Sequence, residues 1–373
     1  MTANSKTSIQ EQCERIDQLC KEFLAASDHE GPLQIMEVCG THTMCIAKSG
    51  LPSLLPDELK LVSGPGCPVC VTDQSYIDRA LYLATKSEPR PIIATYGDMV
   101  RVPGSGGSLS EARAAGARIE VVYSADQAVD IALANPDIEV VFLAVGFETT
   151  SPGAALAVLR SRRENVSNFS IMTAQKFILP AMHALLSQED VRIDGFLCPG
   201  HVSVILGWKA YETIASRYGR PCVVAGFDAA QVLASVEAIL LQLSGGQAEA
   251  GTAYPSVTPH GNRRAMELLD EVFVPSDASW RGLGVIPESG MELQESFEEY
   301  DATIRFNLPD FPAHEAPLCR CGDVICGRLH PTECGLFSSR CTPRSPVGPC
   351  MVSSEGACAA AYKYGSHNKR RNP

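Results

Sequence analysis

The sequence predicts an α/β protein with two parallel-sheet α/β domains and a small cysteine-rich domain. Two observations predict this class. From about residue 31 to about residue 255, short apolar runs alternate with helical patterns, as they do in parallel sheets covered by helices. After about residue 255 this alternation gives way to sequence interrupted by Pro and Gly, which ends in a tail that holds seven of the 15 cysteines.

The predicted elements follow one another in a simple order along the chain. Residues 1–30 should form a helical lead-in, because their apolar side chains recur at near-helical spacing. Domain I is expected over residues 31–125, domain II over residues 126–255, and a cysteine-rich third domain over residues 256–373. The predicted strands are Gln34–Val38, Leu59–Ser63, Pro91–Tyr96, Arg118–Tyr123, Val140–Val145, Ser170–Thr173, Gly195–Leu197 and Cys222–Ala225, and the helices between them include Tyr76–Lys86, Ser124–Ala134, Gly153–Arg163, Pro180–Leu186 and Ala229–Leu243.

Size and charge narrow the classes of function. A chain of 373 residues can bury large cores without disulfides, so we expect its cysteines to serve chemistry rather than structure. A net charge of −12 argues against a nucleic-acid partner, because phosphate contacts require basic patches. No apolar run approaches the roughly 20 residues that span a bilayer, and the first residues lack an apolar signal-peptide core. We therefore expect a cytoplasmic protein without membrane contact.

Two turns near the front of the chain carry cysteines at the ends of predicted strands. Ligand sites of open α/β sheets lie beyond the carboxyl ends of their strands, where turns from several strands could converge on one cleft. Cys39 is followed by His42, and a thiol near an imidazole can be an activated nucleophile or part of a metal site. A buried structural role for Cys39 is the alternative.

Cys67 and Cys70 form a Cys-Pro-Val-Cys turn. We expect this turn to open a helix that starts near Asp73, whose dipole would lower the pKa of the thiols. Such a pair can cycle between dithiol and disulfide or can bind a metal through two thiolates. Incidental cysteines in a buried turn are the alternative.

Four polar residues at other strand ends rank below these thiols. Glu148 and His201 are candidate acids, bases or groups that orient ligands, although a residue of either type at a strand end is about as often a structural hydrogen-bonding group. The turns at Asp98 and Asp228 rank lower still.

The tail contains more cysteines than one metal centre needs. A zinc site or an iron–sulfur cluster takes four ligands, and zinc sites usually pair two Cys-x-x-Cys knuckles, which this tail lacks. Ligands scattered along the chain favour an iron–sulfur cluster over zinc, and both remain open from the residues alone. The tail cysteines are Cys319, Cys321, Cys326, Cys334, Cys341, Cys350 and Cys358.

Several motifs in the same order resemble those of the hydrogenase formation and maturation protein family HypD. The resemblance covers nearly everything from residue 30 onward. It is carried by Met36-Glu-Val-Cys-Gly-Thr-His-Thr, Gly64-Pro-Gly-Cys-Pro-Val-Cys, Ala94-Thr-Tyr-Gly-Asp-Met, Gly146-Phe-Glu-Thr-Thr, Pro199-Gly-His-Val-Ser, Cys341-Thr-Pro and Met351-Val-Ser-Ser-Glu-Gly-Ala-Cys.

The resemblance implies two α/β domains and a smaller domain with a [4Fe-4S] cluster. Its ligands would be Cys319, Cys334, Cys341 and Cys358, which fit the family spacing C-x14-C-x6-C-x16-C. The first ligand is the least defined, because Cys321 neighbours Cys319.

The resemblance also implies a role in building the Fe(CN)2CO group of [NiFe] hydrogenases. The chain would be an assembly scaffold with redox activity rather than a conventional enzyme. It would hold iron that carries CN and CO ligands with Cys39, Cys67 and Cys70, while His42, Glu148 and His201 orient ligands or shuttle protons. A HypC-type chaperone and a HypE-type cyanide carrier would be its partners.

Two other hypotheses about the function compete with this one. The first is an iron–sulfur-dependent thiol–disulfide oxidoreductase that acts on a protein substrate through Cys67 and Cys70 without bound mononuclear iron. The second is a zinc-stabilised binding module without redox chemistry.

Overall fold

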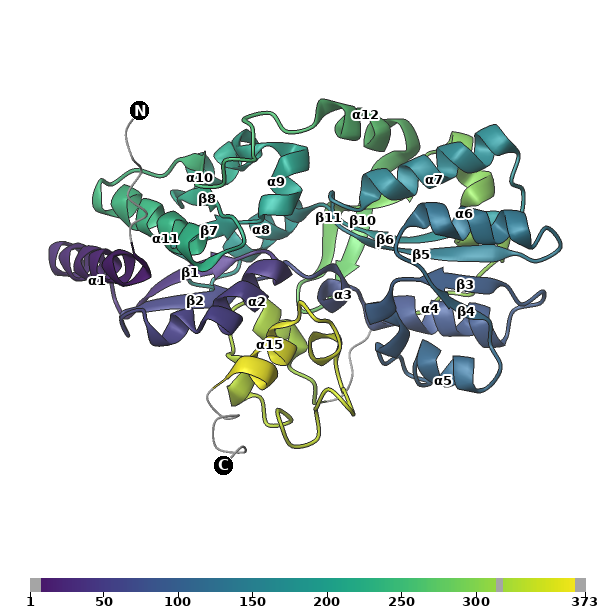
Figure 1. The fold of residues 1–373 in the computed structure, drawn as a ribbon, viewed down its shortest axis with the longest axis horizontal. Helices are drawn as coiled ribbons and strands as arrows, with labels where there is room; N and C mark the ends of the chain where they lie inside the picture. Colours follow the sequence, from purple (N-terminus) through teal and green to yellow (C-terminus); the bar gives the residue numbers. More distant parts are fainter. Residues whose placement is uncertain (1–7, 313–317, 366–373) are drawn as a thin grey trace.

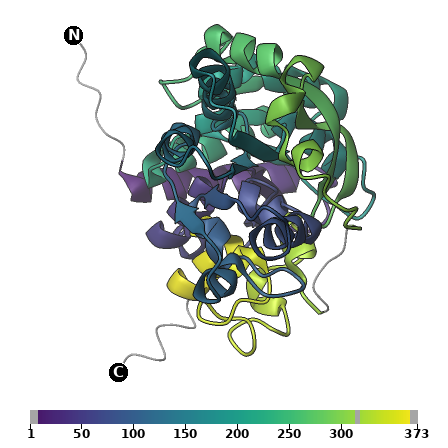
Figure 2. The ribbon, with the colours of Figure 1, turned by 90° about the vertical axis from the view of Figure 1, so that its right-hand side faces the viewer.

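The structure is a computed structural model that describes residues 8–312 and 318–365. The first seven residues of the predicted lead-in and the last eight residues of the predicted third domain lie outside these ranges. Within them, two α/β lobes lie side by side, and the cysteine-rich tail lies along one side of the molecule (Figure 1 and Figure 2). The predicted α/β class with parallel sheets is confirmed.

The first lobe is built on a five-stranded parallel sheet in the order β2-β1-β7-β8-β9. Its side chains alternate between two cores, so that Ile35 and Leu197 face one side and Met36 and Phe196 face the other. The strands are β1 (Leu33–Glu37), β2 (Leu59–Ser63), β7 (Gly195–Cys198), β8 (Cys222–Val224) and β9 (Ala250–Thr252), and the lobe's helices are α1 (Ile9–Ala26), α2 (Gly40–Ser49), α9 (Gly200–Leu206), α10 (Glu212–Tyr218) and α11 (Ala229–Ser244).

The helical lead-in is confirmed as α1. Ser8 caps it in a reciprocal pairing with Glu11, which satisfies backbone groups that the first turn leaves without partners. Ile16 and Cys20 are fully buried in one core with the side chains of α11. Cys20 therefore serves packing.

The second lobe is built on a four-stranded parallel sheet in the order β4-β3-β5-β6. Both faces are covered by helices, which explains why its central strands are continuous apolar runs. The strands are β3 (Ile92–Thr95), β4 (Ile119–Val121), β5 (Val140–Gly146) and β6 (Phe169–Gln175), and the helices are α4 (Gln74–Thr85), α5 (Leu109–Ala114), α6 (Ala125–Ala134), α7 (Ser151–Glu164) and, returning to the first lobe, α8 (Ile178–Leu186).

The two sheets do not divide the chain near residue 125, where we expected a boundary. After β1 and β2 the chain leaves the first lobe and forms the whole second sheet. It then returns to the first lobe, where β7 pairs with β1. The second sheet is thus an insertion into the first lobe. The sequence could not show this order, because strand pairing is a non-local contact. The apolar residues of a strand show that both of its faces are buried, but not which strand lies beside it.

The chain after residue 255 forms two separate parts rather than one cysteine-rich unit. Its first part, which the sequence assigned to the third domain, contains α12 (Arg263–Val272) and an antiparallel hairpin of β10 (Phe273–Trp280) and β11 (Gly284–Leu293), followed by α13 (Ala302–Arg305). Phe273 and Met291 of this hairpin join the core of the second lobe. The cysteine-rich tail begins only afterwards and contains α14 (Cys321–Ile325) and α15 (Ala357–Tyr364).

No helix in the described parts of the chain is both long and apolar enough to cross a membrane.

Candidate metal and thiol centre

The turns that follow β1 and β2 meet at the carboxyl edge of the first sheet. The two strands are parallel neighbours in register, so their ends leave the sheet side by side. The backbone N–H of Gly40 donates a hydrogen bond to the carbonyl of Gly66 at 3.1 Å. A Cβ atom on Gly66 would lie 2.1 Å from the backbone nitrogen of Cys39, so only glycine permits this approach. The contact brings the Cys39 turn against the turn that begins at Cys67.

Cys67 and Cys70 belong to a separate one-turn helix, α3 (Pro68–Val71), rather than to the helix that we expected near Asp73. The Cys67 thiol caps α3 and accepts a hydrogen bond from the Cys70 backbone N–H at 3.2 Å. Asp73 caps the next helix, α4, through the N–H of Ser75. Pro68 at the first helical position and Asp73 after the last turn explain why α3 is so short.

The expectation of a lowered thiol pKa is wrong for Cys70, because this thiol is buried, and the thiol of Cys39 is buried as well. Burial raises the pKa of Cys39 to about 12, and the carboxylates of Glu355 and Glu37 add to this, although the backbone amide of His42 opposes it. Burial also raises the pKa of Cys70 well above its usual value. These thiols therefore keep their protons at neutral pH until a cation displaces them.

Six of the seven tail cysteines line one small cavity with Leu336, Phe337 and Met351 around it. The six are Cys319, Cys321, Cys334, Cys341, Cys350 and Cys358. They include all four of the expected cluster ligands, and both Cys319 and Cys321 face the cavity. Cys326 lies elsewhere, with its Sγ 3.5 Å from the carbonyl oxygen of Gly282.

This donor set fits an iron–sulfur cluster in type and number, since clusters are held by four thiolates. Gly348 leaves room for the thiols, because a Cβ there would lie 2.6 Å from the Sγ of Cys319. No group of three His, Cys, Asp or Glu side chains in the described ranges is arranged around a single point that would hold one metal ion.

Cys350, to which the sequence assigned no role, connects the cavity to the front thiols. Its side chain packs in one buried cluster with those of Cys70, Cys321 and Cys358, and these thiols act on its pKa. It lies on a short 3-10 turn, Pro349–Met351, that packs against α3. A continuous series of sulfur atoms therefore runs from the Cys67 and Cys70 turn into the cavity.

Asp98, which ranked low from sequence, anchors the tail beside Cys67. Its Oδ2 accepts hydrogen bonds from the Ser353 hydroxyl at 3.0 Å and from the Ser354 backbone N–H at 3.1 Å. The Cys67 thiol donates to the same Ser353 oxygen at 3.5 Å. A strand-end turn of the second lobe, the tail and the front thiols thus share one hydrogen-bond network.

Glu37 and Glu355, which the sequence also left without roles, flank the Cys39 turn. Glu37 is buried and accepts a hydrogen bond from the Cys39 backbone N–H at 3.1 Å. Glu355 accepts one from the Thr41 hydroxyl at 2.7 Å. Both residues lie within stretches that carry the family resemblance. The position of Glu37, two residues before Cys39, was the feature of the sequence that could have identified it as a residue of the site.

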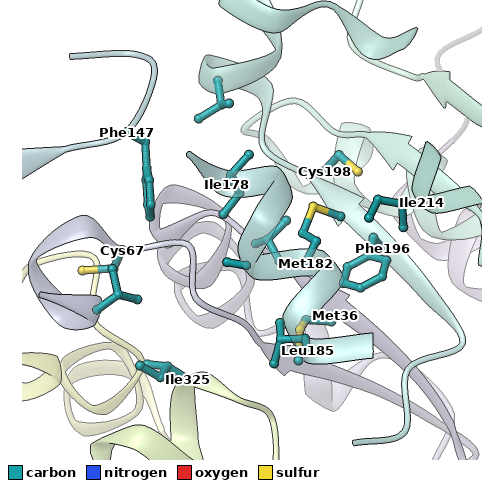
Figure 3. Close-up of a cluster of buried hydrophobic side chains, with 14 of the residues drawn as sticks. Met36, Cys67, Phe147, Ile178, Met182, Leu185, Phe196, Cys198, Ile214 and Ile325 are labelled. Atoms are coloured by element: carbon teal, nitrogen blue, oxygen red, sulfur yellow. The ribbon is translucent and has the colours of Figure 1, made fainter. Parts of the chain in front are cut away.

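Glu148 is buried at the end of β5. One carboxylate oxygen accepts a hydrogen bond from the Ile178 N–H at 3.0 Å, and the other has no partner within the described ranges. Burial raises the pKa of Glu148 to about 7. Its neighbour Phe147 and Cys67 lie at the same end of the buried cluster in Figure 3, on opposite lobes.

The rings of both histidines lie against the Phe227 ring. The His201 side chain is exposed, and its ring stacks on Phe227 with a distance of 3.9 Å between ring centroids. The His42 ring is buried, and its centroid lies 5.2 Å from that of Phe227. His42 Nε2 donates to the Ala225 carbonyl at 3.2 Å, and burial lowers its pKa to about 4. Toward Cys39, His42 presents its backbone N–H.

Comparisons with known proteins identify the family of this chain. The family model HypD, described as the "Hydrogenase formation hypA family", matches residues 11–365. This chain belongs to the HypD family.

Curated HypD-family relatives match over nearly their whole length. The chain is 41% identical over 365 residues to the hydrogenase maturation factor HypD2 of Bradyrhizobium diazoefficiens, with 95% of this chain and 96% of the relative covered. It is 43% identical to the HypD of Cupriavidus necator, covering 88% and 89%. It is 41% identical to the HypD of Escherichia coli, covering 94% and 95%.

Proposed function

We propose that this HypD-family chain is a hydrogenase maturation factor that serves as the scaffold for assembling the Fe(CN)2CO group of [NiFe] hydrogenases. One observation carries the proposal: the Cys39 turn lies against the Cys67 and Cys70 turn, and Cys350 connects that pair to a cavity lined by six cysteines. The names of the relatives support the maturation role.

The iron that receives the cyanide and carbonyl ligands is the cargo of the scaffold. Cys39 would anchor it, with Cys67 and Cys70 as further ligands or as a redox pair. Soft thiolates suit iron that carries strong-field diatomic ligands. Because the Cys39 and Cys70 thiols are protonated when no metal is bound, iron capture would release protons, so binding should tighten as pH rises.

The tail would hold the [4Fe-4S] cluster through Cys319, Cys334, Cys341 and Cys358. When bound, this cluster would supply electrons. Reduction of a Cys67–Cys70 disulfide takes two electrons and two protons and yields the two thiols, and Cys350 lies between that pair and the cavity. Glu148 can hold a proton near neutral pH because of its raised pKa. His42 and His201 are the weaker candidates for proton transfer, since their rings contact Phe227.

The proposal includes a small HypC-type chaperone that shares the iron and a HypE-type carrier that delivers cyanide, both met in the cytoplasm. The test is infrared spectroscopy of anaerobically purified protein, alone and with the chaperone, together with iron and sulfide analysis. Cyanide and carbonyl bands with iron above the cluster's four would support the scaffold.

Cys39→Ala should abolish these bands and remove the iron in excess of the cluster. Cys45→Ala is the matched control, because Cys45 lies on the same helix α2 and is only partly buried. Equal iron retention in the two variants would refute the anchoring role of Cys39.

The contact between Cys70 and Cys350 also favours a second candidate, a thiol–disulfide oxidoreductase that reduces a protein substrate with electrons from the tail. Cluster iron without any excess iron or infrared bands, even with the chaperone present, would favour this candidate. Zinc without iron would contradict both candidates.

A further inference from the structure

Arg281 lies at the tip of the β10–β11 hairpin, between the front thiols and the tail. Its backbone N–H donates to the Val71 carbonyl at 2.9 Å, and its Nη2 donates to the Thr72 carbonyl at 3.0 Å. These carbonyls lie at the carboxyl end of α3, the helix that carries Cys70. A guanidinium at a helix carboxyl end satisfies carbonyls that have no partner in the helix.

Arg281 is a buried charge that pairs with no carboxylate in residues 8–312 and 318–365. It is only 2% exposed, and within the same ranges its Nε has no hydrogen-bond partner. Lys176, buried nearby beside Trp280, can lose its charge because burial lowers its pKa to about 7. A guanidinium cannot, and a buried charge without a counter-charge costs several kcal/mol. The surroundings of Arg281 must therefore supply an anion.

The cysteine cavity is the available source of negative charge. The hairpin tip packs tightly on the tail, since a Cβ on Gly282 would lie 2.4 Å from the Cα of Gly322, the residue after Cys321. Arg281 also lies close enough to Cys319, which lines the cavity, for the two side chains to interact electrostatically. Thiolates in the cavity would supply the anion that Arg281 lacks.

We propose that Arg281 is the built-in counter-charge of the cysteine cavity, which favours the reduced state of a cluster bound there and holds α3 against it. This rests on the proposed function only in that the cavity holds the cluster. Reduction adds a negative charge, and a fixed cation in a low-dielectric site stabilises the more negative state. Arg281 is thus a positioning residue for electron transfer between the cavity and Cys70.

The test is the midpoint potential of the cluster in full-length, anaerobically purified protein, measured by redox titration with spectroscopic detection. R281Q should make the cluster at least tenfold harder to reduce, which is a downward shift of about 59 mV for a one-electron couple. R320Q is the matched control. Arg320 adjoins Cys319 and also lines the cavity, but its side chain is 52% exposed and pairs with Asp323, so its removal should change little.

R281K keeps a positive charge and separates charge from geometry. The equilibrium constant for reduction of the cluster in R281K should stay within a few-fold of the wild-type value. Cluster loss in R281Q but not in R281K would also support the proposal. An unchanged potential in R281Q, an equal shift in R320Q, or cluster loss in both Arg281 variants would overturn it. Wild-type protein that binds no cluster would instead refute the proposed function.

Discussion

At the scale of single residues, burial rather than helix position decides the chemistry of the thiols. Cys39 occupies the N-cap position of α2, where the backbone amides of Thr41 and His42 act to lower the pKa of its thiol. Burial and two nearby carboxyl groups outweigh this effect, so the thiol remains protonated. A buried thiol that keeps its proton should react slowly with alkylating reagents while no metal is bound.

Glu148 should make the stability of the protein depend on pH. Burial raises its pKa from 4.5 to about 7, so between these values the folded protein holds a proton that the unfolded chain releases. The free energy of unfolding contributed by this group is therefore highest below pH 4.5 and falls as pH rises toward 7.

The variant E148Q mimics the protonated side chain and should lack this dependence. The free energy of unfolding of E148Q, relative to that of the wild type, should rise by up to about 3 kcal/mol between pH 4.5 and 7, since one pKa unit corresponds to about 1.4 kcal/mol. Urea unfolding of metal-free protein across this range measures the difference. E267Q, at an exposed carboxylate of α12, should show no such trend. A constant difference between E148Q and the wild type would contradict the prediction.

At the scale of elements, the site depends on the close approach of two turns. Gly66→Ala would place a methyl group 2.1 Å from the Cys39 backbone nitrogen, and the nearest atoms all belong to the backbone of Val38 and Cys39, which cannot rotate away. We expect a loss of more than about 2 kcal/mol of stability, as for overpacked cores, together with weaker iron binding.

Gly153→Ala is the matched control for this substitution. Gly153 lies within α7, and a Cβ there would meet no atom within 4 Å. Alanine should stabilise this helix by up to about 1 kcal/mol and leave iron binding unchanged. Thermal unfolding and iron analysis of both variants test the pair, and similar stability in the two would show that the turns can separate without cost.

At the scale of the whole molecule, Asp98 joins the second lobe to the tail beside Cys67. Asp98→Ala removes three hydrogen bonds to Ser353 and Ser354. Hydrogen bonds to charged groups contribute about 1.5–3 kcal/mol each. We expect amide exchange in residues 349–356 to accelerate at least tenfold, as hydrogen–deuterium exchange with mass spectrometry would show.

Asp228→Ala is the control at the equivalent place in the first lobe. Asp228 ends the β8 turn and caps α11 through the Gln231 N–H at 2.8 Å. Its loss should weaken α11 by about 1 kcal/mol without any change in tail exchange. Equal exchange of the tail in both variants would mean that Asp98 does not anchor it.

The sequence by itself determined the parallel α/β class, the strand-end thiols and the cysteine-rich tail, because periodicity and spacing are local properties of the chain. Only the tertiary structure decided that β7 returns to β1, which makes the second sheet an insertion. It also decided that Cys350 contacts Cys70, that Asp98 reaches Ser353 and that Arg281 is buried without a carboxylate partner among the described residues. These contacts join residues 160 or more positions apart, since Ile35 pairs with Gly195 and Asp98 bonds to Ser353. Such pairings, and the burial that sets each pKa, depend on how separate elements pack, which no single stretch of sequence encodes.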